Sequence, residues 1–307
     1  MKKALVIGAT GGMGSALVKE LVDRGITVVA FARDNKKLNT LGAYHDSIIL
    51  QQGDAFRYAD VKKAASNVDV IFHAVNLPYA SWEQDQERLM DTILKVGKES
   101  SCKLAMVDNI YAYHRNSINP VTEGADKEPH TKKGKIRLRL EEKIKQSTVP
   151  YLICHFPDFF GPNANSSLLH YTLSTMKKNT TARFVGNQDV NREFIYTIDG
   201  ARDMVALSLL EDTYYQNWNI RGNGVVRGEE LVEIMKEVTG YTNRVGTVHK
   251  SMVRLIGVVD KQMREYVEMF YLNEQPLILS GAKVEERLGK RERVSYQEGI
   301  EEMARCM

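Results

Sequence analysis

The stretch Val6-Ile7-Gly8-Ala9-Thr10-Gly11-Gly12-Met13-Gly14 decides the fold of this chain. It follows the apolar run Ala4–Ile7, which is typical of a buried parallel strand. After it, apolar residues recur at helical spacing up to Val22, and Gly25 is placed to end that helix. The glycines at positions 8, 11 and 14 therefore lie on a corner between a strand and a helix.

A corner of this kind predicts a dinucleotide site, because each glycine has a task there. One makes the tight turn, one lets a pyrophosphate approach the backbone, and one lets the helix pack closely on the strand. Free N–H groups at the start of the helix then face the phosphate. A turn with a purely structural role is the alternative, but a second strand predicted at 27–31 favours the dinucleotide site. The expected cofactor contacts are Gly8, Thr10, Gly11, Gly12, Met13 and Gly14.

The composition argues against several classes of function. A chain of 307 residues that is 43% hydrophobic can bury a full core in one large or two modest domains. Because 42 Lys and Arg oppose 39 Asp and Glu, we expect neither nucleic acid nor a membrane surface as the main partner.

The cysteines and the N-terminus bear on the compartment. The three cysteines are widely spaced and lack metal-ligand spacing, which indicates a reducing compartment and no metal site. No apolar run is long enough to span a bilayer. A strand that begins by residue 4 leaves no room for a signal peptide. We therefore expect a cytoplasmic protein.

Strand and helix patterns alternate through the first half of the chain. This alternation predicts an α/β fold, a Rossmann-type doubly wound parallel sheet with helices on both faces. Ligands of such sheets bind at the carboxyl ends of the strands, where the winding reverses. The later strands are predicted at 47–50, 68–74, 103–107 and 151–155, with helices at 61–65, at 83–99 and within 128–146.

The pattern loosens after Gly161-Pro162 and predicts a smaller C-terminal α+β lobe. We divide the chain into a dinucleotide-binding domain at 1–160 and a mainly substrate-binding lobe at 161–307. Segments near 190–222 are expected to return to the first domain, so no single clean boundary is predicted. Helices are predicted at 168–178, 200–210, 229–238, 250–270, 282–288 and 297–304, and strands at 192–199, 218–220 and 276–279.

These landmarks resemble the extended short-chain dehydrogenase/reductases, the NAD-dependent epimerase/dehydratase family, from end to end. The turn Gly53-Asp54 looks like the adenine-binding turn of that family, and residues 72–75 look like the strand end that faces the nicotinamide ribose. Residues 159–162, 192–201, 218–222 and 288–300 are similar to its later signatures. The resemblance implies further cofactor contacts from Asp54, Ala55, Ala74, Val75, Asn76 and Phe156.

The choice of cofactor depends on the end of the second strand. A binder selective for NAD usually places an acidic residue there, to bond the ribose 2′-hydroxyl. This chain has Phe31-Ala32-Arg33, and an Arg can pair with the 2′-phosphate of NADP. We therefore expect NADP(H) as the preferred cofactor, with NAD(H) as the alternative. If Arg33 has no function, it is simply a solvated side chain at a strand end.

The catalytic positions depart from the family. Its hydride chemistry uses a Ser or Thr with a Tyr and a Lys four residues apart on one helix. Here Asn109 stands at the hydroxyl position, Lys133 at the Tyr position and Arg137 at the Lys position. Residues 133–137 also resemble the helix of isoflavone-reductase-like and NmrA-like atypical dehydrogenases, in whose reductases a Lys here is thought to deliver the proton.

Two readings of these positions follow. In the first, Lys133 contacts the cofactor and acts as acid or base, with a pKa lowered by partial burial and by Arg137. Tyr111 is the alternative proton donor and Asn109 a catalytic or substrate contact. In the second, the site has lost its chemistry, and the two cations hold phosphate or lie on a solvated face. The expected substrate contacts are Asn109, Asp158, Phe159 and Arg192.

The favoured function is NAD(P)-dependent oxidoreduction, with NADP(H) reducing or oxidising a small carbonyl, alcohol or enone. One alternative is a non-catalytic NADP(H) sensor of the NmrA type, and another is a nucleotide-sugar epimerase or dehydratase with an altered site. The expected partner is a small-molecule substrate. The resemblance also implies a homodimer that pairs through the helices at 83–99 and 131–146.

Overall fold

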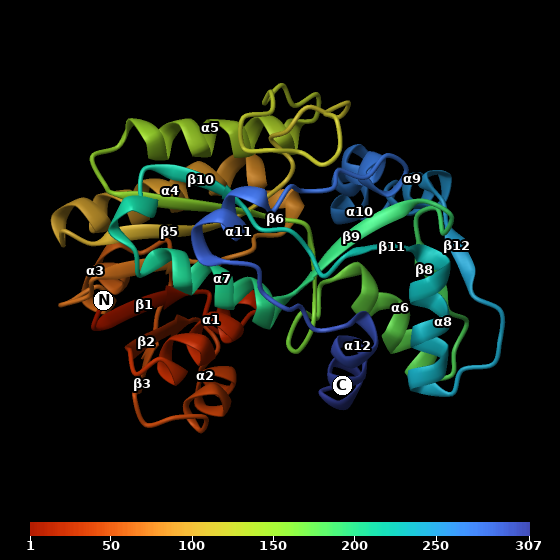
Figure 1. Cartoon of the computed structure of the whole chain (residues 1–307), viewed down its shortest axis with the longest axis horizontal. Coiled ribbons are helices and arrows are strands. Elements are labelled where there is room, and N and C mark those ends of the chain that lie inside the picture. The colour runs from red at the N-terminus through yellow and green to blue at the C-terminus, as the bar shows by residue number, and fades with distance from the viewer.

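The computed structural model describes residues 1–307 and is built on a seven-stranded parallel sheet (Figure 1). The strand order is β10-β6-β5-β4-β1-β2-β3. The chain thus runs from β1 to β3 at one edge, and then from β4 to β10 at the other. The direction reverses between β1 and β4, and sheets of this kind bind ligands at such a point. The strands are β1 (Lys3–Ile7), β2 (Thr27–Ala32), β3 (Ile48–Gln52), β4 (Val70–His73), β5 (Lys103–Asn109), β6 (Tyr151–Phe156) and β10 (Gln216–Asn219).

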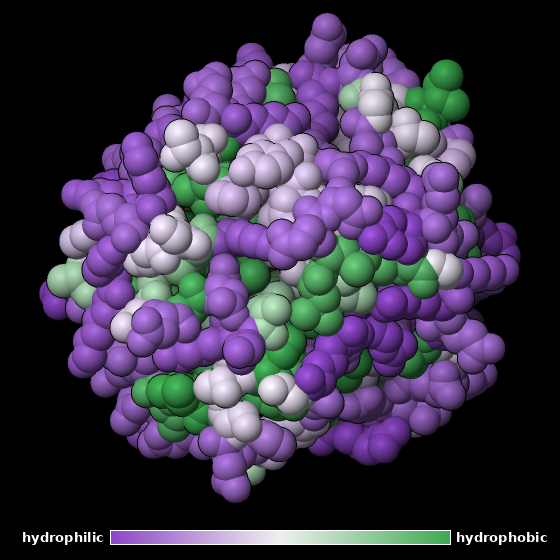
Figure 2. All heavy atoms as spheres, turned by 60° about the vertical axis from the view of Figure 1, so that its left-hand side comes forward, coloured by the Kyte–Doolittle hydropathy of each residue, from purple (hydrophilic) through white to green (hydrophobic).

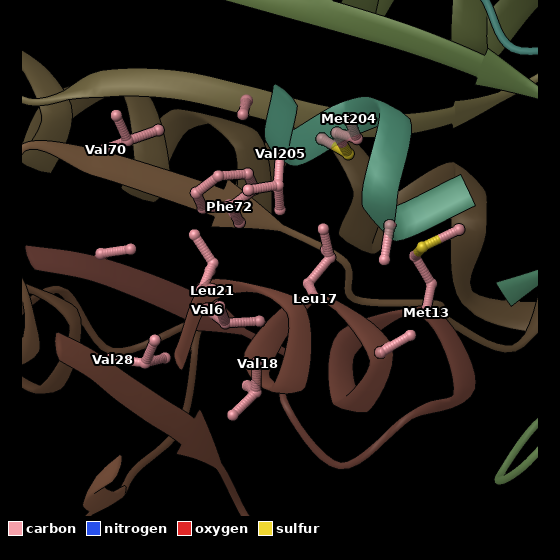
Figure 3. Packing of buried hydrophobic residues seen from close by; sticks show 14 of the residues in the cluster. Val6, Met13, Leu17, Val18, Leu21, Val28, Val70, Phe72, Met204 and Val205 are labelled. Atoms are coloured by element: carbon pink, nitrogen blue, oxygen red, sulfur yellow. The ribbon is translucent and has the colours of Figure 1, made fainter. Parts of the chain in front are cut away.

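Helices cover both faces of this sheet, because its central strands β1, β4 and β6 are buried on both faces. One face carries α1 (Gly12–Asp23), α2 (Asn35–Gly42) and α7 (Thr197–Ser208). The other carries α3 (Tyr58–Ala64), α4 (Trp82–Glu99) and α5 (Lys132–Gln146). In Figure 3, Leu17 and Leu21 extend from α1 toward Phe72 of β4 and Val205 of α7, within one buried cluster. This packing fixes the start of α1 at the carboxyl edge of the sheet.

The second lobe has its own small core between two short sheets and three helices. A three-stranded sheet has the order β11-β9-β7, and β8 pairs with β12. The strands are β7 (Asp158–Phe160), β8 (Arg183–Val185), β9 (Asn191–Tyr196), β11 (Val225–Arg227) and β12 (Gly246–Val248). The helices of this core are α6 (Leu168–Lys177), α8 (Gly228–Thr239) and α12 (Tyr296–Arg305).

The remaining segments connect the lobe to the sheet. The helices α9 (Lys250–Ile256) and α10 (Lys261–Tyr266) are followed by the 3-10 helix η3 (Val267–Asn273). The helix α11 (Ala282–Leu288) returns to pack on α7 and β10. Two further 3-10 helices are η1 (Tyr79–Ser81) and η2 (Glu211–Thr213).

The single helix predicted over 250–270 is wrong, because the chain turns between α9 and α10. The backbone at Gly257 packs so closely on Arg264 that a Cβ there would lie 2.9 Å from the Arg264 Cα. Asp260 then begins α10 by accepting a hydrogen bond from the Met263 N–H at 3.0 Å. The predicted strand at 276–279 is also absent, and only an isolated bridge joins Leu279 to Val121.

The surface is hydrophilic over most of the face drawn in Figure 2, where apolar residues lie in small groups between charged ones. That distribution is ordinary for a folded domain. No helix of the chain has both the length and the apolar content that are needed to cross a membrane.

Candidate active site

The glycine loop has the geometry that a dinucleotide requires. Gly8 has φ +87°, and a Cβ there would lie 2.8 Å from the Ala74 carbonyl oxygen at the end of β4. A Cβ at Gly14 would lie 2.0 Å from the Gly8 oxygen, so only glycine lets α1 approach β1 this closely. At Gly11 the nearest atom would be 3.5 Å away, so this backbone is open to a ligand.

The start of α1 fits an anion. Its N-cap is Gly11, which offers no side chain to the free N–H groups, and the first turn holds no acidic residue. A segment of the lobe lies over this turn: the Asn163 amide donates to the Ser15 hydroxyl at 3.2 Å, and Ala164 packs on Gly12. Pyrophosphate oxygens would therefore accept hydrogen bonds from these N–H groups, on a surface that lobe residues partly cover.

The end of β2, where the sequence predicts the adenosine ribose, carries an unpaired cation. Arg33 follows β2, is exposed and makes no ion pair. The neighbouring carboxylate, Asp34, is used to cap α2, since it accepts from the N–H groups of Lys36 and Lys37 at 3.0 and 3.1 Å. Asp54 forms the turn after β3 by accepting from the Phe56 N–H at 3.0 Å, with Ala55 buried behind it.

Lys133 is buried at the start of α5 and is held by two carboxylates of the lobe. Its ammonium pairs with Glu265 and lies 3.2 Å from Glu268. Glu268 also accepts hydrogen bonds from the backbone N–H groups of Lys132 and Lys133, so it caps the helix as well. These carboxylates were not predicted, and they offset the cluster of cations at a helix start.

Arg137 lies one turn along α5 but faces a different anion. Its Nε is 2.7 Å from Asp108 Oδ1, and both side chains are buried. The charges that contact Lys133 are therefore the two lobe carboxylates, rather than Arg137 alone as the sequence suggested. The guanidinium also lies 5.3 Å from the centre of the Trp82 ring.

An aromatic group surrounds the position of Tyr111. The hydroxyl oxygens of Tyr111 and Tyr79 are 2.6 Å apart, and the ring of Tyr79 is stacked on Tyr266 of α10. Burial raises the pKa of Tyr111 well above 10, and burial raises the pKa of Tyr266 to about 12. Tyr111 is therefore a neutral phenol at physiological pH.

His73 ends β4 and Asn109 ends β5, two adjacent strands of the sheet. The Asn109 Oδ1 accepts from the Tyr111 N–H at 3.0 Å, so this amide fixes the turn that presents Tyr111. His73 is buried, and burial together with Arg137 lowers its pKa to about 3. Its Nδ1 has no hydrogen-bond partner. The sequence analysis did not name His73 as a site residue, because a histidine in an apolar strand is usually a packing residue.

Tyr111 and Lys133 are brought together by Gly134. A Cβ at this position would lie 2.4 Å from the Tyr111 carbonyl oxygen, so only glycine lets the start of α5 approach the end of β5. The Lys133 ammonium is 5.9 Å from the centre of the Tyr79 ring. Asn76 and Val75 follow β4 in the adjacent loop.

The structure also brings together two of the predicted substrate residues. Arg192 of β9 is buried, and its guanidinium lies 3.3 Å from the Asp158 carboxylate of β7. Its other nitrogen donates to the Val185 carbonyl at 2.9 Å. Phe159 packs on Phe156, with ring centres 5.5 Å apart. Arg192 is thus already bonded on two sides, whereas the Asp158 side chain keeps 40% of its surface exposed.

A cluster of charged groups lies behind the site. Asp108, Glu141 and His155 are close enough together to share a metal ion. The ammonium of Lys127, however, lies 2.5 Å from Glu141 and 3.1 Å from His155 Nε2. Burial lowers the pKa of His155 to about 4, so the ring is neutral and accepts this bond. We assign the cluster to charge pairing within the chain and not to a metal.

Glu193 ties the lobe to the segment that returns to the sheet. Its buried carboxylate accepts hydrogen bonds from the N–H groups of Gly222 at 2.8 Å and Leu279 at 3.0 Å. Burial raises its pKa to about 7, although the two bonds and nearby arginines oppose this rise.

The sequence of this loop and of the strands beyond it matches a known family. The model of the NAD(P)H-binding family matches residues 8–190. The chain belongs to this family. Among the curated proteins, this NAD(P)H-binding protein is 20% identical to the Photosystem II assembly factor Ycf39 of Synechocystis sp., over 83% of its own length and 73% of that protein.

Solved structures give the same fold. UDP-glucose 4-epimerase of Thermotoga maritima has a TM-score of 0.79 at 17% identity, with 99% of this chain and 98% of that one covered. UDP-glucuronic acid 4-epimerase of Bacillus cereus, bound to UDP-glucuronic acid and NAD, has a TM-score of 0.80 at 18% identity with the same coverage. The dTDP-glucose 4,6-dehydratase of Bacillus anthracis has a TM-score of 0.79 at 14% identity, covering 100% and 96%. The predicted Rossmann-type fold of the epimerase/dehydratase type is therefore confirmed.

Proposed function

We propose that this NAD(P)H-binding protein is an NADP(H)-dependent oxidoreductase that acts on a small carbonyl, alcohol or enone. The observation that carries the proposal is the hydroxyl pair of Tyr111 and Tyr79, 2.6 Å apart, at the sheet edge that also carries the glycine loop. Strands β1, β4 and β5 are neighbours in the sheet, so their carboxyl ends lie side by side. A proton donor and a dinucleotide cradle thus share one edge.

The bound nicotinamide would exchange a hydride with the substrate carbon. Tyr111 would supply the proton to the substrate oxygen or, for an enone, to the adjacent carbon. Tyr79, within hydrogen-bond distance of Tyr111, would return a proton to it. Burial raises the pKa of Tyr111, so the phenol carries its proton before the reaction, and the proposed direction is reduction. Asn109 would hold Tyr111 in place through the Tyr111 N–H.

We further propose that NADP(H) is preferred over NAD(H). Arg33 is exposed, has no acidic partner and follows β2, where the adenosine ribose of a Rossmann cofactor lies. The adjacent carboxylate, Asp34, is occupied in capping α2. A guanidinium there would pair with the 2′-phosphate.

The test is the consumption of NADPH over a panel of aldehydes, ketones, quinones and enones. Tyr111→Phe should lower kcat by more than about tenfold, with NADPH binding unchanged, since a loss of that size marks a transition-state contact. Tyr44→Phe is the matched control, because its hydroxyl contacts only Asp23 on the surface. Full activity of Tyr111→Phe would exclude the proposed proton donor and return the role to Lys133.

A second candidate function is a non-catalytic NADP(H) sensor, and one observation favours it. Lys133 is buried beneath Glu265 and Glu268, so α10 and η3 cover the group that a substrate would have to reach. A sensor would bind NADPH and change its proteolysis pattern in α9 and α10 without consuming the cofactor. Turnover of any compound in the panel would decide against it.

An altered nucleotide-sugar epimerase or dehydratase is the remaining proposal. The solved structures of that class share the fold, but this chain has Lys133 and Arg137 in place of the Tyr and Lys pair. Incubation with UDP-sugars and detection of an epimer or a dehydrated product would test it.

A further inference from the structure

The turn between α9 and α10 exposes four aliphatic side chains within five residues. The exposed fractions are 74% for Leu255, 47% for Ile256, 73% for Val258 and 89% for Val259. An exposed cluster of this kind is unusual for a monomeric surface, where apolar side chains are normally scattered. We name these four residues the aliphatic tip.

The backbone of the tip is ordered by its own hydrogen bonds. The N–H groups of Val259 and Asp260 both donate to the Ile256 carbonyl, at 3.1 and 3.0 Å. On its inner side, Val253 of α9 packs in a small core with Phe270 and Val185. The hairpin therefore has one face anchored in the lobe, while its tip holds the aliphatic side chains outward.

Cations flank the tip on both helices. Lys250 and Arg254 lie on α9, and Lys261 and Arg264 lie on α10. None of the four makes an ion pair with a carboxylate. The acidic groups of the hairpin are otherwise engaged, since Asp260 caps α10 and Glu265 pairs with Lys133.

We propose that the aliphatic tip docks this protein on an anionic membrane surface. Exposed aliphatic side chains between helices that carry unpaired cations match an interface in which the apolar groups enter the acyl boundary and the cations meet lipid phosphates. A second copy of the chain fits less well, because a symmetric contact would bring the four cations against their own equivalents.

The size of the patch points the same way. Four side chains form a much smaller patch than the ~800 Å² per partner of a stable protein interface. A membrane needs no matching shape, so a small protruding tip suffices. The balanced charge of the whole chain led us to expect no membrane partner, but net charge averages over a surface on which these cations gather at one end. This inference is independent of the proposed reaction.

The test is sedimentation of the full-length protein with vesicles of phosphatidylcholine that contain phosphatidylserine, compared with phosphatidylcholine alone. The wild type should bind the anionic vesicles, and the double variant Val258→Ser, Val259→Ser should bind more than about fivefold more weakly. Ile118→Ser is the matched control, since Ile118 is also 89% exposed but has only polar neighbours in sequence. NADPH binding by each variant verifies that it is folded.

Three outcomes would overturn the proposal. The first is a wild type that sediments with neither kind of vesicle, and the second is a double variant that binds as the wild type does. The third is light scattering that finds a dimer for the wild type and a monomer for the double variant, in which case the tip is a contact between copies. Retained binding by Ile118→Ser, together with the loss in the double variant, supports it.

Discussion

Replacing Arg137 by Met should destabilise the fold strongly, because it leaves a buried carboxylate without its cation. Arg137 Nε lies 2.7 Å from Asp108 Oδ1, and the exposed side-chain fractions are 8% and 1%. Asp108 Oδ1 also accepts a hydrogen bond from the Asn109 N–H at 2.7 Å and the second oxygen has no hydrogen-bond partner, so Arg137 is the one cation in direct contact with this carboxylate. Met fills much of the space of the Arg stem and keeps helix propensity, which isolates the charge.

The magnitude follows from the burial of the pair. Removing one partner of a buried ion pair costs about 3–5 kcal/mol, whereas replacing both partners by neutral groups is often close to neutral. We therefore expect Arg137→Met to lower the free energy of unfolding by about 3–5 kcal/mol, and Arg137→Met with Asp108→Asn to recover more than about half of that loss.

Urea denaturation followed by circular dichroism measures these differences. Arg139→Met is the control on the same helix: its pair with Glu87 is 2.9 Å long but about half exposed, so a loss below about 1 kcal/mol is expected. Equal losses for Arg137→Met and Arg139→Met would refute the argument from burial. So would a double variant that is less stable than Arg137→Met.

Three further predictions concern the cofactor and the lobe. Arg33→Ala should raise KM for NADPH by about tenfold and leave KM for NADH unchanged, which steady-state kinetics with both cofactors would reveal. Gly14→Ala places a methyl group against the Gly8 oxygen and should lose more than about 1 kcal/mol of stability and most NADPH binding, whereas Gly124→Ala, with open space around it, should behave as the wild type in thermal melts and titrations. In the folded protein the pKa of Glu193 is raised to about 7, so the free energy of unfolding should fall by about 3 kcal/mol as the pH rises from about 4.5 to 7. Glu193→Gln should remove most of this fall. An unchanged dependence of stability on pH in urea titrations of Glu193→Gln would rule the assignment out.

The fold could be predicted because its strongest determinants are local. The glycine corner, the buried strand runs and the alternation with helices each depend on residues near one another in sequence, and all agree with the observed sheet. The strands β7, β8, β11 and β12 were missed because each spans only three residues, too few to show a period. The break in 250–270 was missed because Gly257 is in contact with Arg264, which a helical periodicity does not reveal.

Fewer contacts of the candidate site than elements of the fold could be predicted from the sequence. The positions of Lys133 and Tyr111 followed from strand and helix order, but their partners did not. Glu265 and Glu268 lie more than 130 residues beyond Lys133, and nothing in their local sequence marked them as its partners. Tyr79 was likewise unremarked, since a tyrosine in a loop acquires a role only once the fold sets it against Tyr111.

The position of β10 at the sheet edge has a consequence for synthesis of the chain on the ribosome. β6 ends at Phe156, but the strand that pairs with its outer edge begins about 60 residues later, and α7, which covers α1, also comes from that later stretch. At about 5–20 residues per second, the growing chain carries an unpaired strand edge that is fully buried in the folded protein, and an uncovered helix face, for about 3–12 s. Slowing translation over residues 157–220 should therefore lower the yield of folded protein, while the same delay after residue 220 should have less effect.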